Sequence, residues 1–298
     1  MKTFRFMGAV LIAAASVVGF TACSDDEGGG GTGGTGLVDG KKLVKWQYNR
    51  DDGSGKLEGE YYLLEYDGQG RLANDKYFYA NNGMETYEWR GVTSYIWKES
   101  TIHEEYTDVD SDGNPTSLAE MNDYTLENGL ITHVGMRDGD SNDAREYHYE
   151  DDIRYDGNGR PVTIVTTGYE PNGEIDPWDC QTYSFIWDGD RLEGFTVEDH
   201  NGQVTTYTYS YSPGTPCKAY YPYHDISFHM DVLESSIIMA HPELVGLRLT
   251  TIPTELTYTD NDGTKTYKYD AQTDADGFLT RLTVSYSDLS YIYRYTWE

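Results

Sequence analysis

The acidic residues from position 108 onward come closest to a chemical site by type and spacing. Asp108, Asp110 and Asp112 alternate and are followed by Gly113, which is how a calcium loop of the EF-hand type begins. Such a loop closes with an acidic ligand at its twelfth position, and that position is Ala119 here. The spacing therefore predicts an acidic hairpin turn and no metal site.

The seven histidines do not form a zinc-hydrolase pattern. His224 and His229 are five residues apart and lack the glutamate of a His-Glu-x-x-His helix. The sequence also has no Gly-x-Ser-x-Gly nucleophile motif and no phosphate-binding glycine loop. We therefore predict a non-enzymatic protein with no catalytic residue and no cofactor. The alternative is a carbohydrate hydrolase, because a catalytic carboxylate pair could be hidden among the 51 acids.

Aromatic residues are abundant, with 28 tyrosines, 8 phenylalanines and 6 tryptophans. Sugar rings stack on exposed aromatic side chains, so these residues could form a binding platform. Buried area favours the other interpretation, in which they pair across strands within a core. The core interpretation is preferred for each single aromatic, the tryptophans included. The tryptophans are Trp46, Trp89, Trp97, Trp178, Trp187 and Trp297.

Two of the three cysteines could form a disulfide. Cys180 and Cys217 are separated by 217 − 180 = 37 positions, and a bridge would stabilise the fold by up to about 3–4 kcal/mol if the geometry permits. Two cysteines alone carry no framework pattern, so a disulfide and two free thiols are both open. The net charge of −29 excludes nucleic acid as a natural partner, because phosphate binding needs a positive surface.

The first residues resemble a bacterial lipoprotein signal. Lys2 and Arg5 precede an apolar run that ends before Thr21, Ala22 and Cys23, although Phe20 replaces the usual leucine. The resemblance implies that residues 1–22 are removed, that Cys23 is acylated, and that acyl chains anchor the protein in the outer membrane. Ser24 and the acidic residues 25–27 that follow it resemble the export signal of Bacteroidales lipoproteins, which predicts exposure to the cell exterior.

The remaining chain is predicted to be a flexible tether followed by one domain. Residues 28–36 contain only glycine and threonine, which indicates a tether over 23–40. Asn-Gly and Asp-Gly pairs then recur at intervals of about 15 residues, as expected for hairpin turns. Gly68 and Gly157 are each predicted to hold a positive φ. About a dozen long antiparallel strands over 41–298 follow from this spacing.

Between the turns, aromatic and β-branched residues alternate with polar ones, as on a half-buried strand. So many strands must curl or close, because an open sheet rarely exceeds about ten. Lys268 and Arg294 interrupt any apolar band, so the predicted all-β shell lies in water. One segment lacks turn pairs, and its helical spacing predicts a short helix near 229–240 that caps the barrel or fills its mouth.

Several turns resemble the YD repeat of Rhs-type and teneurin-type shells. The copies are Tyr66–Leu72, Tyr155–Arg160, Trp187–Leu192 and Asp276–Leu279. With these turns and the lipoprotein-like start, the chain is similar to Bacteroidales lipoproteins of unknown function with a porin-like fold. That family implies an antiparallel, barrel-like architecture over 41–298 and brings no activity with it.

These observations predict a surface-anchored lipoprotein that binds a ligand or partner without catalysis. A glycan or a neighbouring envelope protein would be the partner, and the outer membrane would be contacted through the acyl chains. The runner-up is the carbohydrate hydrolase. A third interpretation is a purely structural envelope component.

Overall fold

The computed structural model describes residues 40–51, 53, 58–80, 86–139, 147–223 and 235–298. Residues 1–39, which include the predicted leader and Cys23, lie outside these ranges, as do His224 and His229. No helix within the described ranges is long and apolar enough to cross a bilayer.

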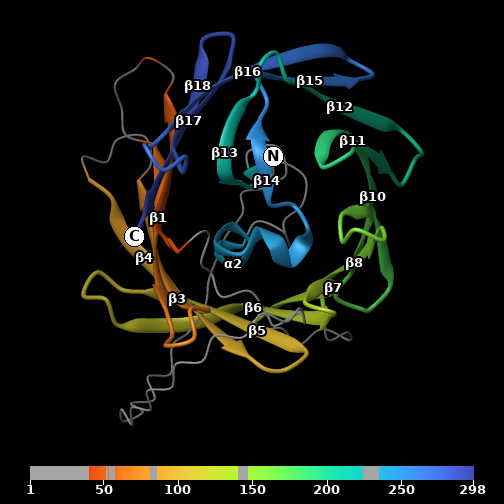
Figure 1. Ribbon diagram of the computed structural model, residues 1–298. Coiled ribbons are helices and arrows are strands. Elements are labelled where there is room, and N and C mark those ends of the chain that lie inside the picture. Colours follow the sequence, from red (N-terminus) through yellow and green to blue (C-terminus); the bar gives the residue numbers. More distant parts are fainter. Residues whose placement is uncertain (1–39, 52, 54–57, 81–85, 140–146, 224–234) are drawn as a thin grey trace, which may run out of the picture.

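A closed antiparallel barrel of 16 strands forms the wall of the described structure (Figure 1). In chain order the strands are β1 (Leu43–Asp51), β2 (Gly59–Tyr66), β3 (Leu72–Ala80), β4 (Glu88–Trp97), β5 (Thr101–Val109), β6 (Pro115–Glu127), β7 (Leu130–Asp138), β8 (Tyr149–Tyr155), β9 (Pro161–Tyr169), β10 (Ile175–Asp188), β11 (Arg191–Asp199), β12 (Val204–Ser210), β15 (Glu255–Asp260), β16 (Gly263–Thr273), β17 (Leu279–Tyr286) and β18 (Leu289–Trp297). Consecutive strands pair, β12 pairs with β15, and β1 pairs with β18 to close the ring. The predicted all-β barrel is confirmed, with more strands than the dozen expected.

The turns alternate between the two ends of the barrel because successive strands run in opposite directions. The chain enters β1 and leaves β18 at one end, called here the terminal end, where Lys42 and Glu298 exchange backbone hydrogen bonds of 2.7 and 2.9 Å. The opposite end is called the far end. It carries, among others, the turns at 110–114, 170–174, 200–203 and 261–262.

An insert between β12 and β15 occupies the interior of the ring (Figure 1). It contains the hairpin β13 (Thr215–Tyr220) and β14 (Leu249–Ile252), the helix α2 (Ser236–Ala240) and the 3-10 helix η2 (Pro242–Val245). All five residues of α2 are buried, and Ser235 caps it by accepting a hydrogen bond from the Ile237 N–H. The helix predicted near 229–240 is therefore present over 236–240, and residues 229–234 lie outside the described ranges.

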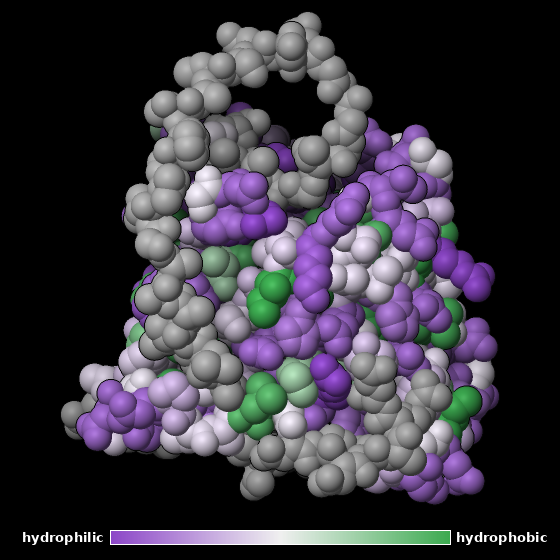
Figure 2. Space-filling view, turned by 90° about the horizontal axis from the view of Figure 1, so that it is seen from below, coloured by the Kyte–Doolittle hydropathy of each residue, from purple (hydrophilic) through white to green (hydrophobic). Residues whose placement is uncertain are grey.

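Along much of the wall, aromatic side chains point inward and polar side chains point outward. Phe195 of β11 stacks on Tyr207 of β12 with ring centroids 4.3 Å apart, and the two residues are register partners. Cross-strand aromatic pairing was predicted and is confirmed. On β16, the outward Lys268 and Asp270 flank the buried Tyr269. The side of the molecule in Figure 2 is mainly hydrophilic, with isolated hydrophobic residues.

The repeated turns have a common hydrogen-bonding pattern that differs in one respect from the prediction. In the turn at 156–160, the Asp156 Oδ1 atom accepts backbone hydrogen bonds from Asn158 (2.8 Å) and Arg160 (3.1 Å). The residue with positive φ is Gly159 (75°), not Gly157. In the turn at 67–71 it is likewise Gly70 (82°), not Gly68. The aspartate uses its side chain to fix the first turn residues, so the left-handed residue falls after them.

Both described cysteines are free thiols, so the disulfide that the sequence left open is not formed. Cys180 lies in β10 of the wall, where its Sγ contacts the Asp176 carbonyl oxygen at 3.2 Å. Cys217 lies in β13 of the insert, 3.8 Å from the Leu249 carbonyl oxygen. Burial raises the pKa of the Cys217 thiol to about 12, which keeps it protonated and unreactive.

Candidate functional site

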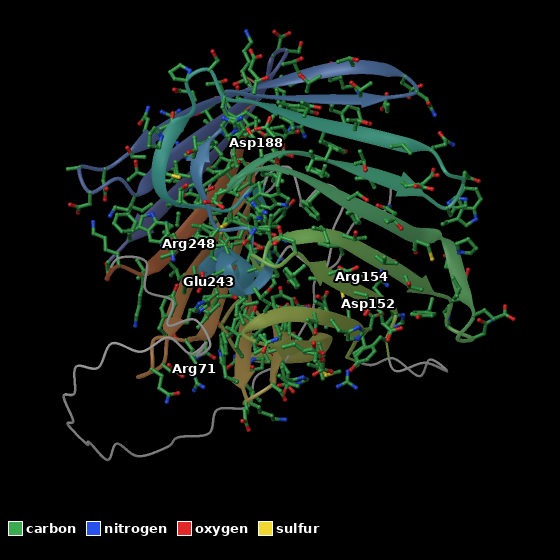
Figure 3. The ribbon with its side chains drawn as sticks, turned by 45° about the vertical axis from the view of Figure 1, so that its right-hand side comes forward. Arg71, Asp152, Arg154, Asp188, Glu243 and Arg248 are labelled. Carbon is green, nitrogen blue, oxygen red and sulfur yellow. The ribbon has the colours of Figure 1, made fainter. Side chains whose placement is uncertain are left out.

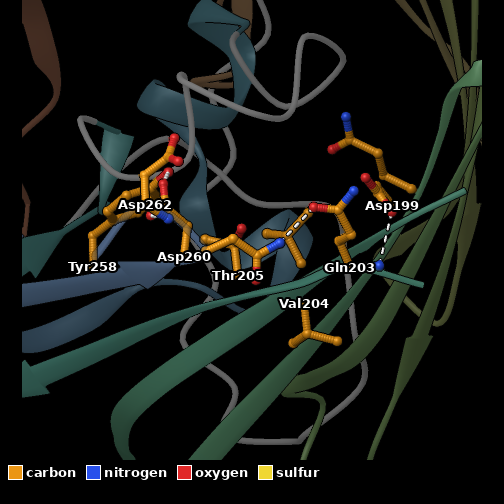
Figure 4. A pocket seen from close by; sticks show the side chains of 10 residues that line it. Asp199, Gln203, Val204, Thr205, Tyr258, Asp260 and Asp262 are labelled. Atoms are coloured by element: carbon orange, nitrogen blue, oxygen red, sulfur yellow. Dashed lines mark hydrogen bonds between the residues drawn. The ribbon is translucent and has the colours of Figure 1, made fainter. Parts of the chain in front are cut away.

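A polar cleft of about 280 Å³ lies at the far-end rim of the barrel, between the β11–β12 and β15–β16 turns (Figure 4). Its walls come from the ends of neighbouring strands and from both turns. The lining residues are Gln181, Val197, Asp199, Gln203, Val204, Thr205, Tyr258, Asp260, Asn261 and Asp262. A rim built from strand ends is rigid, because each strand is hydrogen-bonded on both sides.

The β11–β12 turn fixes one wall of the cleft. The Asp199 Oδ1 atom accepts backbone hydrogen bonds from Asn201 (2.8 Å) and Gln203 (2.9 Å). These bonds, led by that from Gln203, lower the pKa of Asp199, so it is ionised at neutral pH. The Asn261 side-chain amide donates to Gln203 Oε1 at 2.6 Å, which links the two turns directly.

The β15–β16 turn fixes the other wall. Asp260 Oδ1 accepts from the backbone N–H groups of Asp262 (2.8 Å) and Gly263 (3.0 Å), while its Oδ2 accepts from the Tyr258 hydroxyl. The hydrogen bond between Tyr258 and Asp260 raises the pKa of Tyr258 to about 12 and lowers that of Asp260. The cleft therefore presents amides and ionised carboxylates whose positions are set before any ligand arrives.

Trp178 is 73% exposed and does not line the cleft, but it contacts the β11–β12 turn that forms one wall of it. It lies in a bulge of β10, where the five steps from Asp176 to Gln181 match only two steps on β9. Its ring contacts that of His200, in the β11–β12 turn, with centroids 4.3 Å apart. An exposed, ordered indole next to polar groups is the arrangement that stacking on a sugar ring requires.

Of the other tryptophans, one lies in the core, three lie at the terminal end, and Trp89 lies near the start of β4 and is 36% exposed. Trp46 is 1% exposed and stacks on Tyr62 at 4.3 Å, as the core interpretation predicted. At the terminal end, the indole N–H groups of three tryptophans donate to backbone carbonyls on neighbouring strands. The pairs are Trp97 with Leu72, Trp187 with Pro161 and Trp297 with Leu279, at 2.8–2.9 Å.

Arginines of the turn motifs complete these contacts. The guanidinium of Arg71 lies 5.8 Å from the Trp97 ring centroid, and that of Arg160 lies 5.6 Å from Trp187. The YD-like residues at this end thus stabilise the wall by cation–π and hydrogen-bond contacts. Figure 3 shows Arg71 on the wall and Glu243 and Arg248 on the insert.

The calcium-like loop is a hairpin turn, as predicted. Asp110 Oδ1 accepts from the backbone N–H groups of Asp112 and Asn114, both at 2.9 Å, and Gly113 has a φ of 82°. Among the described residues, no group of three or more acidic, histidine or cysteine side chains has metal-binding geometry.

A second set of acids lies inside the barrel, on β3 and β5. Asp75 is 1% exposed and Glu104 is 7% exposed. Burial raises the pKa of Asp75 to about 7, with smaller effects from Tyr95 and Glu104. The adjoining cavity of about 40 Å³ is far below the ~300 Å³ at which small-molecule pockets begin. Strand alternation predicts which residues face inward. It does not predict which inward residues of different strands lie close together, so the sequence carried no signal for this cluster.

Comparison with known proteins shows the fold. No protein-family model matches the chain, and no curated protein matches it. A porin-like protein from Bacteroides uniformis ATCC 8492 aligns with a TM-score of 0.60 at 13% identity, covering 86% of this chain and 98% of that one. A porin-like protein from Bacteroides vulgatus ATCC 8482 aligns with a TM-score of 0.55 at 16% identity, covering 85% and 97%. The chain thus has the fold of these porin-like proteins, which the sequence resemblance predicted.

Proposed function

We propose that this protein is a lipid-anchored outer-membrane protein that faces the cell exterior and binds a glycan, without catalysis, at the far end of its barrel. The observation that carries the proposal is the exposed Trp178, whose ring contacts the turn that forms one wall of the 280 Å³ polar cleft. The similarity to porin-like proteins of Bacteroides supports an envelope location.

The direction of the strands supports the use of the far end. The described chain begins at the terminal end of the barrel, so a tether acylated at Cys23 would approach that end. The cleft would then point away from the membrane. The interior is filled by the insert, which favours binding at the rim over passage through the barrel.

The chemistry of the cleft favours a neutral glycan. Asparagine, glutamine and aspartate side chains exchange hydrogen bonds with sugar hydroxyl groups, and an indole stacks on the apolar face of a sugar ring. Asp199, Asp260 and Asp262 make the cleft acidic, so uronic acid and sulfated polymers would be repelled.

A glycan array and a polysaccharide pull-down with the purified protein test this proposal. Trp178→Ala should weaken binding at least about tenfold with an unchanged melting temperature, because the side chain is mostly exposed. Trp89→Ala is the matched control, since Trp89 is also partly exposed (36%) but lies on β4, away from the cleft. Equal binding by Trp178→Ala and the parent protein would refute the site.

The alternatives have distinct outcomes in the same experiments. Sugar release that depends on two carboxylates would establish the carbohydrate hydrolase. No glycan binding, together with co-purification of envelope proteins, would favour a structural component. For location, Cys23→Ser should abolish acylation, and resistance of the unmutated protein to protease on intact cells would reject exposure to the exterior.

A further inference from the structure

We propose that the far-end site takes an unbranched chain of neutral sugar units and binds it along several of those units, not by a single terminal sugar. The inference rests on the glycan function proposed above and names the class of glycan. The observation that carries it is the order in which the binding groups follow one another across four neighbouring strands of the wall.

The polar groups of the cleft follow the order of the strands. Tyr258 and Asp260 belong to β15, Thr205 belongs to β12, and Asp199 belongs to β11. These strands are neighbours in the barrel in the order β15, β12, β11. Figure 4 shows the same order, with Tyr258 at the left, Thr205 in the middle and Asp199 at the right. The groups therefore form a row across the rim of the barrel.

Trp178 extends this row by one more strand. It belongs to β10, which pairs with β11 on the side away from β12. Its ring contacts that of His200, which directly follows Asp199 in the chain. Neighbouring strands are about 4.8 Å apart, so the four strands from β15 to β10 spread the binding groups over about 14 Å. One sugar ring cannot contact both ends of such a row, whereas an extended chain of sugars can.

The row consists largely of hydrogen-bond acceptors. An ionised carboxylate has about four acceptor sites, and Asp199 uses two of them for the backbone N–H groups of its own turn. The Tyr258 hydroxyl donates its one proton to Asp260, so its oxygen acts as an acceptor towards a ligand. Successive sugar units carry hydroxyl donors along the whole length of a chain, which matches acceptors placed at intervals along the row.

Both ends of the row are held in place by hydrogen bonds within the protein. The Trp178 backbone N–H donates to Asp176 Oδ1 at 2.9 Å, and the Tyr149 hydroxyl of β8 donates to Asp179 Oδ2 at 3.0 Å. At the other end, the backbone bonds to Asp260 fix the β15–β16 turn. A fixed distance between the two ends selects a ligand by length, because only a sufficiently long chain reaches both.

Affinity should therefore depend on the number of sugar units. Each further unit that contacts the row adds binding free energy, while the loss of translational and rotational freedom is incurred only once. We expect the affinity to rise with chain length until the row is filled and then to level off. A site for a terminal sugar would reach its full affinity with the monosaccharide.

Isothermal titration of the purified full-length protein with sugar ladders tests the inference. The probes are the malto-, cello-, manno- and xylo-oligosaccharides, each from the monosaccharide to the hexamer. In at least one ladder the hexamer should bind at least about tenfold more tightly than the monosaccharide. Trp178→Ala and Asp262→Ala alter opposite ends of the row, so each should weaken binding of the hexamer and shorten the length at which the affinity levels off.

Asp112→Ala is the matched control for Asp262→Ala. Asp112 is an exposed acid in another far-end turn and does not line the cleft, so this variant should bind every ladder as the parent protein does. Melting temperatures of all three variants should equal that of the parent protein, because the three side chains are exposed.

Three results would overturn the inference and leave glycan binding itself standing. The first is equal affinity for the monosaccharide and the hexamer. The second is a length dependence that is unchanged in both Trp178→Ala and Asp262→Ala, which would place the chain elsewhere on the protein. The third is no binding of any ladder by protein that binds a branched or charged glycan on the array. Absence of binding to every glycan would instead refute the proposed function, and this inference with it.

Discussion

Alanine substitutions at the two glycines of the β8–β9 turn should have different effects on the free energy of unfolding. Gly159 has a φ of 75°, and a Cβ atom there would make only an ordinary 3.5 Å contact with Leu130. The cost of Gly159→Ala is therefore the left-handed backbone alone, about 1–2 kcal/mol. Gly157 does not have a positive φ, and a Cβ atom there would have no neighbour within 4 Å. Gly157→Ala should be neutral, or stabilising by up to about 1 kcal/mol, through the unfolded state.

The pair of variants should thus differ by about 2 kcal/mol, or roughly 4–8 °C in melting temperature for a domain of this size. Urea denaturation followed by tryptophan fluorescence, with calorimetry as a second measurement, would provide both quantities. The same order should hold for Gly70→Ala and Gly68→Ala in the β2–β3 turn, where Gly70 has the positive φ. A larger loss for Gly157→Ala than for Gly159→Ala would refute this account of the turns.

Three further predictions concern the insert, the buried acids and the thiols. Gly246→Ala should destabilise more than Gly159→Ala, because its Cβ would lie 2.1 Å from the Gly159 carbonyl oxygen; an equal melting temperature would contradict this packing of insert on wall. Burial raises the pKa of Asp75 to about 7, above its unfolded value, so stability should fall as pH rises from about 5 to about 8. Asp75→Asn should flatten that pH profile in thermal melts. An unchanged slope would show that Asp75 does not cause the pH dependence of stability. Cys180 and Cys217 should both react with a thiol label in unfolded, unreduced protein, and a protected pair would reveal a disulfide.

The sequence predicted the wall well because its signals are local. Alternation of tyrosine with threonine specifies an inward and an outward face wherever both neighbours are strands. The strand count was too low because some turns contain no glycine. The β4–β5 turn is Lys98, Glu99 and Ser100, and in the β17–β18 turn the left-handed residue is Ser287 with a φ of 53°. Such turns form because the flanking strands pair, so they cannot be recognised from their residue composition.

The candidate site was less predictable because it depends on non-local geometry. Alternation alone would assign Trp178 to a face of β10, whereas the bulge that exposes it arises from pairing with β9. Gly168 is a residue type that the bulge requires, since a Cβ atom there would lie 2.4 Å from Asp179 of the bulge. The choice between Gly157 and Gly159 likewise depends on which backbone groups Asp156 binds. Neither feature can be read from residue types alone.

The ring closes between two strands from opposite ends of the described chain. Strand β1, synthesised first among the strands, finds one of its two neighbours only in β18, where Leu43 pairs with Trp297. The insert precedes β15–β18 in the chain, so a chain that folds in order of synthesis would close these four strands around it. Until they do, both sheet edges remain unpaired and open to association with other chains. Pairing so distant in sequence is expected to form slowly, and loss of β18 would leave both β1 and β17 with an unpaired edge.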